Sequence, residues 1–199
     1  MQNQTLLLIF FIIAGYLSGS IPFGYLIAKL KKIDIRKKGS GNIGGTNVGR
    51  TLGLKYGVLV GILDILKAII PIYIASRYLT QDWQMTLVSI SPVLGHIFPI
   101  WLKFKGGKGV ATVAATIFMI LGLKYSIIFL ASWALTLFVL KIMSLTNLIV
   151  VLFLPVLFWF KTGSVAYFVL AFVYILLIWW AHRENIKRLR QGIEPRIIK

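Results

Sequence analysis

Cysteine is missing from the 199-residue sequence, and acidic side chains are scarce, with five Asp and Glu against 22 Lys and Arg. Without cysteine the chain cannot form disulfides, thiolate metal ligands or a cysteine acyl-enzyme. With so few carboxylates it offers no credible pair of ligands for Mg²⁺, which makes nucleotide hydrolysis a poor hypothesis. We therefore expect neither a metal site nor a cofactor.

The composition indicates a membrane protein instead. Hydrophobic residues make up 58% of the chain, and apolar runs long enough to cross a hydrocarbon core of roughly 30 Å recur along it. We expect one domain, 1–199, with an all-α fold and no cleaved signal; an arrangement of five spans and two half-helices is the alternative. The sequence predicts about seven transmembrane helices, some short or interrupted, at 5–30, 53–76, 86–102, 109–123, 125–141, 147–160 and 164–181.

The distribution of basic residues predicts the orientation. A net charge of +17 would suggest nucleic acid in a soluble protein, but no basic stretch alternates with stacking aromatics, so membrane lipids are the expected partner, with no protein partner. Seven spans place 18 Lys and Arg on the C-terminal side, Lys67 within a span, and only Arg77, Lys124 and Lys161 on the other side. The positive-inside rule then predicts an N-terminus outside and a cytoplasmic C-terminus.

A glycine-rich loop is predicted at 36–50. Its segment from Gly39 to Arg50 contains five glycines, four uncharged hydrogen-bonding side chains, one Arg and no carboxylate. Glycine lets backbone N–H groups turn into a concavity, and the guanidinium of Arg50 is a planar fork that matches phosphate oxygens. The segment therefore indicates an anion site, although a flexible cytoplasmic loop would have a similar composition.

A second glycine-rich loop is predicted at 103–112, where Lys105-Gly106-Gly107-Lys108-Gly109 precedes an apolar helix. The N–H groups of this loop, including those of Gly106 and Gly107, would face an anion together with the positive end of the helix dipole and the charge of Lys108. The spacing is not that of a Walker A loop. A basic turn between two spans is the alternative.

The cytoplasmic tail at 182–199 follows two tryptophans, Trp179 and Trp180, which mark a membrane interface. If the helix continues past them, His182, Asn185 and Leu189 share one face. His182 is the only imidazole expected on the side of the loops, which makes it a candidate general base. A basic helix with an interfacial His is also common for reasons of topology alone.

Several polar residues within the spans have two interpretations. Asp64 and Lys67 stand three residues apart on one helix face, so they would pair structurally or line a polar cavity. His96, three residues before Pro99, is either packed in the core or functional. Near 144–147, Ser144, Thr146 and Asn147 would complete a polar pocket or cap a helix.

Taken together, these segments resemble a known family, the acyl-phosphate-dependent glycerol-3-phosphate acyltransferases of bacterial membranes (PlsY-type). The chain departs from the family pattern at Gly45, where Ala is usual, and at Ile193, where Thr is usual before the glutamate. The resemblance covers nearly the whole chain and rests on the order and spacing of Ser18 to Gly24, Gly39 to Arg50, Asp64 with Lys67, Gly95-His96, Lys105 to Thr112 and His182 to Glu194.

The resemblance implies transfer of a fatty acyl group from acyl phosphate to the 1-hydroxyl of glycerol 3-phosphate, giving lysophosphatidic acid and phosphate. The enzyme would lie in the bacterial cytoplasmic (inner) membrane with its active site facing the cytoplasm. A transporter or channel for phosphorylated anions is the alternative, and a structural membrane subunit comes third. Catalytic roles would fall to Ser40, Arg50, Lys108, His182 and Asn185, substrate binding to Asn42, Thr46, Asn47, Lys105, Gly106, Gly107, Gly109 and Ser144, and structural roles to Asp64, Lys67 and Glu194.

Overall fold

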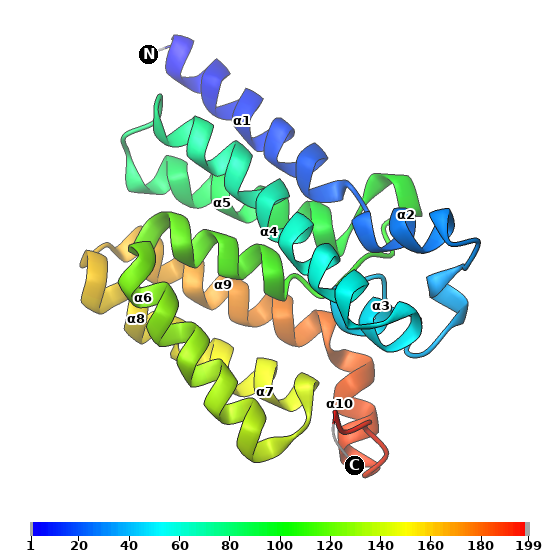
Figure 1. Ribbon diagram of the computed structural model, residues 1–199. Coiled ribbons are helices and arrows are strands. Elements are labelled where there is room, and N and C mark those ends of the chain that lie inside the picture. The colour runs from blue at the N-terminus through cyan, green and yellow to red at the C-terminus, as the bar shows by residue number, and fades with distance from the viewer. Residues whose placement is uncertain (1, 198–199) are drawn as a thin grey trace. The chain divides into compact units, whose positions relative to one another are not determined.

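The computed structural model describes residues 2–197, and among these the chain is helical with no strand (Figure 1). Met1, Ile198 and Lys199, the last of which is one of the 18 cytoplasmic charges, lie outside the described residues. The chain divides into two compact units, Met1–Thr116 and Ile117–Lys199, which we describe separately. The single domain expected over 1–199 stays a prediction.

Each unit is built from helices joined by short connections. Unit 1 contains α1 (Gln2–Ser20), α2 (Phe23–Leu30), the 3₁₀ turn η1 (Ile35–Lys37), α3 (Gly45–Leu52), α4 (Leu54–Ser76), α5 (Asp82–Ile97), η2 (Ile100–Leu102) and the start of α6 (Val110–Leu140). Unit 2 contains the rest of α6, then α7 (Met143–Val150), η3 (Val151–Phe153), α8 (Leu154–Thr162), α9 (Val165–Ala181) and α10 (Arg183–Arg190).

The helices confirm an all-α membrane protein. Among the described residues, five helical segments are long and apolar enough to cross a membrane, and α9 with α10 would make a sixth. Large apolar side chains remain exposed along them, as Phe10 and Leu54 do, which suits contact with lipid. The number of spans and their orientation stay predictions. The helices predicted at 109–123 and 125–141 form one element, α6, broken at Gly122 where φ is +79°.

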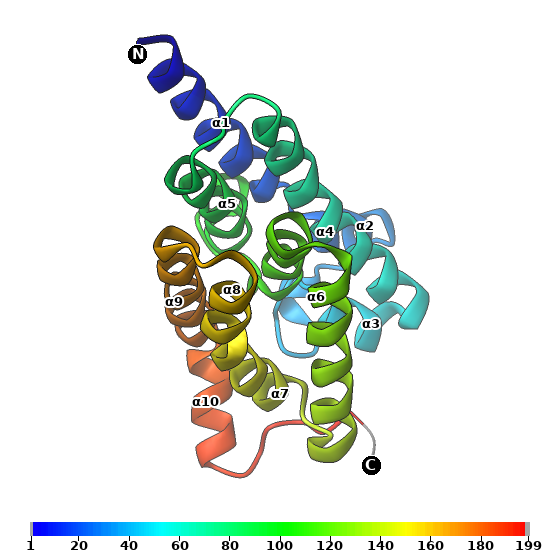
Figure 2. The ribbon, with the colours of Figure 1, turned by 90° about the vertical axis from the view of Figure 1, so that its left-hand side faces the viewer.

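Three expected boundaries were wrong. The helix predicted at 5–30 breaks at Ile21 and Pro22, because proline cannot donate the next helical hydrogen bond. The loop predicted at 36–50 ends at Gly44, where α3 begins. The tail helix does not continue straight from α9, since α9 and α10 are bent by 61° at His182. Figures 1 and 2 show α10 turning away from α9.

Small residues let α1 and α5 pack closely within unit 1. A Cβ added at Gly19 would collide with the backbone of Pro92, and one added at Gly95 would collide with the carbonyl oxygen of Tyr16. In a membrane, where apolar side chains gain little by leaving lipid, such close backbone contact is a main source of helix association. These two positions therefore accept only glycine.

Two glycine pairs join α3 to α4 in the same way. A Cβ at Gly57 would lie 2.7 Å from the carbonyl oxygen of Gly45 and 2.8 Å from the Cα of Gly49. Gly61, one turn after Gly57, has nothing within 4 Å of the corresponding position. Gly45, where the chain departs from the family pattern, thus lies directly against Gly57. This contact packs α3 on α4.

Apolar side chains within and just before the first glycine-rich segment pack it against α2 and α4. Ile35, Ile43 and Val48 are buried with Ala28 of α2 and Val60 of α4 in one cluster. In unit 2 the core forms between α8 and α9, where Phe158 and Tyr174 are fully buried. The first segment is therefore a packed structure, which argues against the flexible-loop alternative.

The contact between α3 and α4 predicts a large difference between two glycines of one helix. Gly57→Ala should destabilise the protein by about 1–3 kcal/mol because the added methyl overpacks the contact with Gly45 and Gly49. Gly61→Ala is the control and should leave stability unchanged or raise it slightly. Thermal unfolding of the detergent-purified variants measures both. Equal unfolding temperatures for the two variants would contradict the contact.

Candidate active site

The side chain of Asn47 organises the first glycine-rich segment, and only 2% of the residue is exposed. Its amide donates to the carbonyl oxygens of Lys38 at 3.0 Å and Asn42 at 2.8 Å, while its Oδ1 accepts the N–H of Ser40 at 2.9 Å. A side chain at Gly39, where φ is +56°, would collide with Oδ1 of Asn47. Because both amide hydrogens are already used, Asn47 shapes the loop and has none left to offer the substrate expected at this position.

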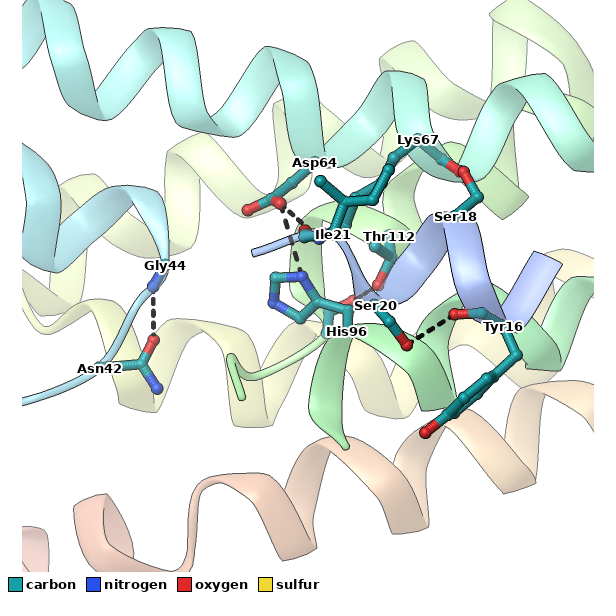
Figure 3. A network of polar contacts seen from close by, with 11 residues as sticks. Tyr16, Ser18, Ser20, Ile21, Asn42, Gly44, Asp64, Lys67, His96 and Thr112 are labelled. Carbon is teal, nitrogen blue, oxygen red and sulfur yellow. Dashed lines mark hydrogen bonds and ion pairs between the residues drawn. The ribbon is translucent and has the colours of Figure 1, made fainter. Parts of the chain in front are cut away.

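The start of α3 presents the polar groups of this segment. Oδ1 of Asn42 accepts the N–H of Gly44 at 2.8 Å, which sets the turn into the helix (Figure 3). Ser40, Thr46 and Arg50 are exposed. The first amides of a helix have no intrahelical acceptor, so those at the start of α3 are suited to an anion, while Arg50 lies in the last turn of the same helix.

Arg36 and Asp34 form an ion pair next to this segment. Arg36 binds Asp34 through Nε and Nη2, both at 2.9 Å, and its guanidinium lies over the ring of Tyr25. The hydrogen bond from the Arg36 side chain lowers the pKa of the Asp34 carboxyl to about 2. Asp34 is thus ionised and neutralised locally, and it adds little repulsion toward an anion at the neighbouring loop.

The second glycine-rich segment is anchored to the end of α5. The N–H of Gly106 donates to the carbonyl oxygen of Ile97 at 3.1 Å, and the N–H of Gly107 donates to that of His96 at 2.9 Å. This corrects the expectation that these two amides face a ligand. The amides that begin α6, from Gly109 onward, are the ones that a helix leaves available for an anion.

The chain is strained just before this segment. Lys103 and Phe104 both adopt left-handed backbone conformations, with φ of +53° and +61°. Such a conformation costs a residue with a side chain roughly 1–2 kcal/mol. The hydrogen bond from the N–H of Phe104 to the carbonyl oxygen of Pro99, at 3.0 Å, helps to hold it. Strain of this kind collects at functional sites, where the surrounding structure holds it in place.

Asp64 and Lys67 form a buried ion pair on α4, with 2.7 Å between Oδ1 and Nζ. Nζ of Lys67 also donates to the carbonyl oxygen of Ile21 at 2.7 Å, and the hydroxyl of Ser18 donates to the carbonyl oxygen of Lys67 at 2.6 Å. The pairing interpretation is therefore the one that fits. The break between α1 and α2 supplies a carbonyl group that accepts a second ammonium hydrogen of Lys67.

His96 joins this pair to the second glycine-rich segment (Figure 3). Its Nδ1 lies 3.6 Å from Oδ1 of Asp64, and its side chain is 5% exposed. The ring lies directly against Gly107, where an added Cβ would collide with Nε2. His96 is thus packed between a buried charge and a loop.

In unit 2 the carboxylate of Glu194 binds three side chains. Its Oε1 accepts from Ser144 at 2.7 Å and from Asn185 at 2.6 Å, and its Oε2 lies 2.7 Å from Nε of Arg188. Burial raises the pKa of Glu194, but these hydrogen bonds and the charge of Arg188 outweigh it and hold the pKa below the ordinary value. Glu194 therefore pairs with a basic side chain, as expected, and also orients Ser144 and Asn185.

His182 lies at the bend between α9 and α10 and is fully buried. Its Nδ1 is 2.8 Å from the carbonyl oxygen of Ile178. A carbonyl oxygen can only accept, so Nδ1 carries a hydrogen, and the lone pair of a neutral ring would then lie on Nε2. This tautomer is the one in which Nε2 can take a proton.

Comparison with known proteins assigns the chain to a family. Residues 9–192 match the family described as glycerol-3-phosphate acyltransferase. The chain belongs to this family.

Curated acyltransferases match over nearly their whole length. The glycerol-3-phosphate acyltransferase of Aquifex aeolicus is 45% identical over 94% of this chain and 98% of its own, and that of Pelagibacter ubique is 43% identical over 92% and 94%. The crystal structure of PlsY, an integral membrane glycerol 3-phosphate acyltransferase in its glycerol 3-phosphate form, has 40% identity and a TM-score of 0.91, and covers 96% of this chain and 95% of that one. The lysophosphatidic acid form matches with a TM-score of 0.88.

Membership confirms the resemblance inferred from the sequence and leaves the transporter and structural-subunit alternatives without support. Within each unit the acyltransferase brings several predicted residues together. Ser40 and Asn42 gather around Asn47, and Asn185 and Ser144 gather around Glu194. Gly106 and Gly107 lie against the end of α5, and Lys105 is exposed. Whether these residues are catalytic or bind substrate stays a prediction.

Sequence reasoning missed some contacts of the acyltransferase and left others open. Arg188 is one of many basic residues in the tail, and nothing in its spacing singled it out as the partner of Glu194. Asn147 accepts a hydrogen bond from the indole of Trp133 at 2.8 Å, a contact between distant residues. Helix α7 has no side-chain cap, which removes the capping interpretation of Ser144, Thr146 and Asn147.

Glu194 should stabilise the acyltransferase in a pH-dependent way. Because its pKa is lowered in the folded state, its contribution is present above the ordinary glutamate pKa and is lost as the pH falls through the lowered value. At pH 7 Glu194→Gln should lose about 1–3 kcal/mol of stability, and its difference from the wild type should shrink toward pH 4 and below.

Glu184→Gln is the matched control for this measurement. Glu184 pairs with Lys187 at 3.2 Å, but both side chains are more than half exposed, so the change should cost at most about 1 kcal/mol. Thermal unfolding in detergent over this pH range compares the two variants. A pH-independent loss in Glu194→Gln, or an equal loss in the control, would refute the role of Glu194.

Proposed function

We propose that the protein transfers a fatty acyl group from acyl phosphate to the 1-hydroxyl of glycerol 3-phosphate, giving lysophosphatidic acid and phosphate. The observation that carries this is the close match to PlsY structures described as the glycerol 3-phosphate form and the lysophosphatidic acid form. The first molecule is the acceptor of the reaction and the second is its product. The acyl-phosphate donor fits the chemistry of the loops, which offer amides and cations to more than one phosphate group.

The second glycine-rich segment is suited to the phosphate of glycerol 3-phosphate. The amides from Gly109 to Ala111 begin α6 at the positive end of its dipole, and Lys108 stands beside them. Gly106 and Gly107 shape this site through their bonds to α5. We assign the first segment, with Ser40, Thr46 and Arg50, to the phosphate of the acyl donor, with Lys105 as a further cation at the second.

Acyl phosphate is a mixed anhydride, so the reaction needs orientation and charge stabilisation more than a covalent intermediate. The 1-hydroxyl oxygen attacks the acyl carbon, the bond from that carbon to the phosphate oxygen breaks, and phosphate leaves with the electron pair. The hydroxyl proton passes to a base, for which we propose Nε2 of His182. Asn185 and Ser144, held by Glu194, would orient the reacting groups.

The orientation is part of the proposal. Most Lys and Arg fall on the side of the glycine-rich loops when the N-terminus lies outside, so the active site would face the cytoplasm of a bacterial inner membrane. The acyl chain can then stay in lipid, where each buried methylene contributes about 0.8 kcal/mol to retention. No carrier protein is needed to present the donor.

Purified protein supplied with acyl phosphate and glycerol 3-phosphate should release phosphate and form lysophosphatidic acid, as measured by a phosphate assay and mass spectrometry. In membrane vesicles, glycerol 3-phosphate added outside should be acylated in inside-out vesicles and not in right-side-out ones. Activity with an acyl carrier thioester but none with acyl phosphate would reject the donor. Equal activity in both vesicle types would reject the orientation.

His182→Ala should lower kcat about 10²- to 10⁴-fold, because proton removal from the hydroxyl then lacks a positioned base. The pH–rate profile of the variant should also differ from that of the wild type. Arg183→Ala, at the exposed neighbour that lies over Trp180, should behave like the wild type. An unchanged rate and pH profile in His182→Ala would favour a substrate phosphate oxygen as the base.

A further inference from the structure

The acyl transfer described above uses none of the three buried ionisable side chains of unit 1. Asp64 and Lys67 have side chains only 4% and 2% exposed, and His96 is equally shielded. Burying a charged group in a membrane is unfavourable in free energy, and removing one partner of a buried pair leaves the other charge uncompensated. Their contacts, however, lead toward both glycine-rich segments.

One end of this cluster holds the chain that enters the first segment. Lys67 donates to the carbonyl oxygen of Ile21 at 2.7 Å, at the break that starts α2, and Nζ lies 5.8 Å from the ring centre of Phe23. Helix α2 in turn touches the first segment, because a Cβ at Gly24 would collide with the carbonyl oxygen of Ile43. Lys67 thus fixes the start of the helix on which that segment is packed.

The other end holds the second segment. The carbonyl oxygen of His96 accepts the N–H of Gly107 at 2.9 Å, and the His96 ring fills the space directly beside the same residue. The neighbouring carbonyl oxygen, of Ile97, accepts the N–H of Gly106 at 3.1 Å. With Nδ1 of His96 3.6 Å from Oδ1 of Asp64, the carboxylate sits between the ammonium and the imidazole (Figure 3).

We infer that Asp64, Lys67 and His96 form a positioning unit, which holds the two glycine-rich segments of unit 1 in the placement needed to bind phosphate. These residues do not touch the reacting atoms in this assignment. They act through Ile21 and α2 on the first segment, and through Gly107 on the second. The inference rests on the proposed function, since it takes the second segment to hold glycerol 3-phosphate.

A positioning role and a purely stabilising one differ in what a substitution changes. If His96 sets the loop, its loss weakens binding of glycerol 3-phosphate in the ground state and the transition state alike. KM for this substrate then rises while kcat is nearly kept. The amides of Gly106 and Gly107 would also lose protection from exchange with solvent, because their acceptors are held by the packed ring.

The test uses the full-length protein in detergent, with His96→Leu as the main variant. We expect KM for glycerol 3-phosphate to rise at least about tenfold and kcat to change less than about threefold. Hydrogen exchange followed by mass spectrometry should show faster exchange in the peptide 103–112. Thr86→Val is the control, because it removes a buried hydroxyl without a hydrogen-bond partner among the described residues, about 15 Å along α5 from His96. It should change neither readout.

A second variant keeps the test decisive if His96→Leu does not fold. Asp64→Asn combined with Lys67→Met removes both charges together at similar volume, which folded proteins tolerate better than one unpaired charge. The same rise in KM and the same faster exchange are expected. A folded His96→Leu or double variant with wild-type KM and wild-type exchange would overturn the inference, as would a loss confined to kcat.

Failure of the inference is distinct from failure of the proposed function. If the wild type released no phosphate from acyl phosphate and glycerol 3-phosphate, the proposed acyl transfer would be rejected. The exchange of the 103–112 peptide would still show whether the cluster holds the loop, because that measurement needs no substrate.

Discussion

The ion pair between Asp64 and Lys67 is the interaction on which the rest of unit 1 depends. Lipid offers no water to satisfy a charge, so each of these side chains needs protein partners for every strong donor or acceptor. Asp64 finds Lys67 and the edge of His96, and Lys67 finds Asp64 and the carbonyl oxygen at the break before α2. If α1 or α5 moved away from α4, one of these charges would lose a partner. The contacts of the ion pair therefore hold α4 to α5 and to the end of α1.

Glycine has two separate uses in this chain. Between α1 and α5, and between α3 and α4, it removes side chains so that helices approach closely in lipid. In the two glycine-rich segments it allows the backbone to turn and to lie against a neighbour, as Gly39 does beside Asn47 and Gly107 beside His96. In both uses the backbone packs against a neighbour, which would hold the segments in place for the proposed transfer.

In unit 2 one carboxylate holds several polar side chains together. Glu194 lies after the turn at Gly192, and it accepts from Ser144 and Asn185 while it pairs with Arg188. A charged acceptor fixes neutral donors more strongly than a neutral one would. Ile193, where the chain departs from the family pattern, is exposed next to it.

The sequence by itself determined the helical membrane character, the family and the position of the glycine-rich segments. Hydropathy is read along a single helix, and the motifs keep their order and spacing in one chain, so neither needs contacts between distant residues. The Asp64–Lys67 pair was also predictable, because three residues along a helix place both side chains on one face.

Only the tertiary structure decided where the polar groups of these segments point. Gly106 and Gly107 donate their amide hydrogens to α5, and the side-chain amide of Asn47 donates within its own loop. Helix α10 bends away after His182. Each of these outcomes depends on an acceptor or a packing surface supplied by a residue that local sequence patterns do not reveal. Hydrogen-bond partners are chosen by the folded arrangement, and that is the physical reason why the motifs could be found in the sequence while their geometry could not.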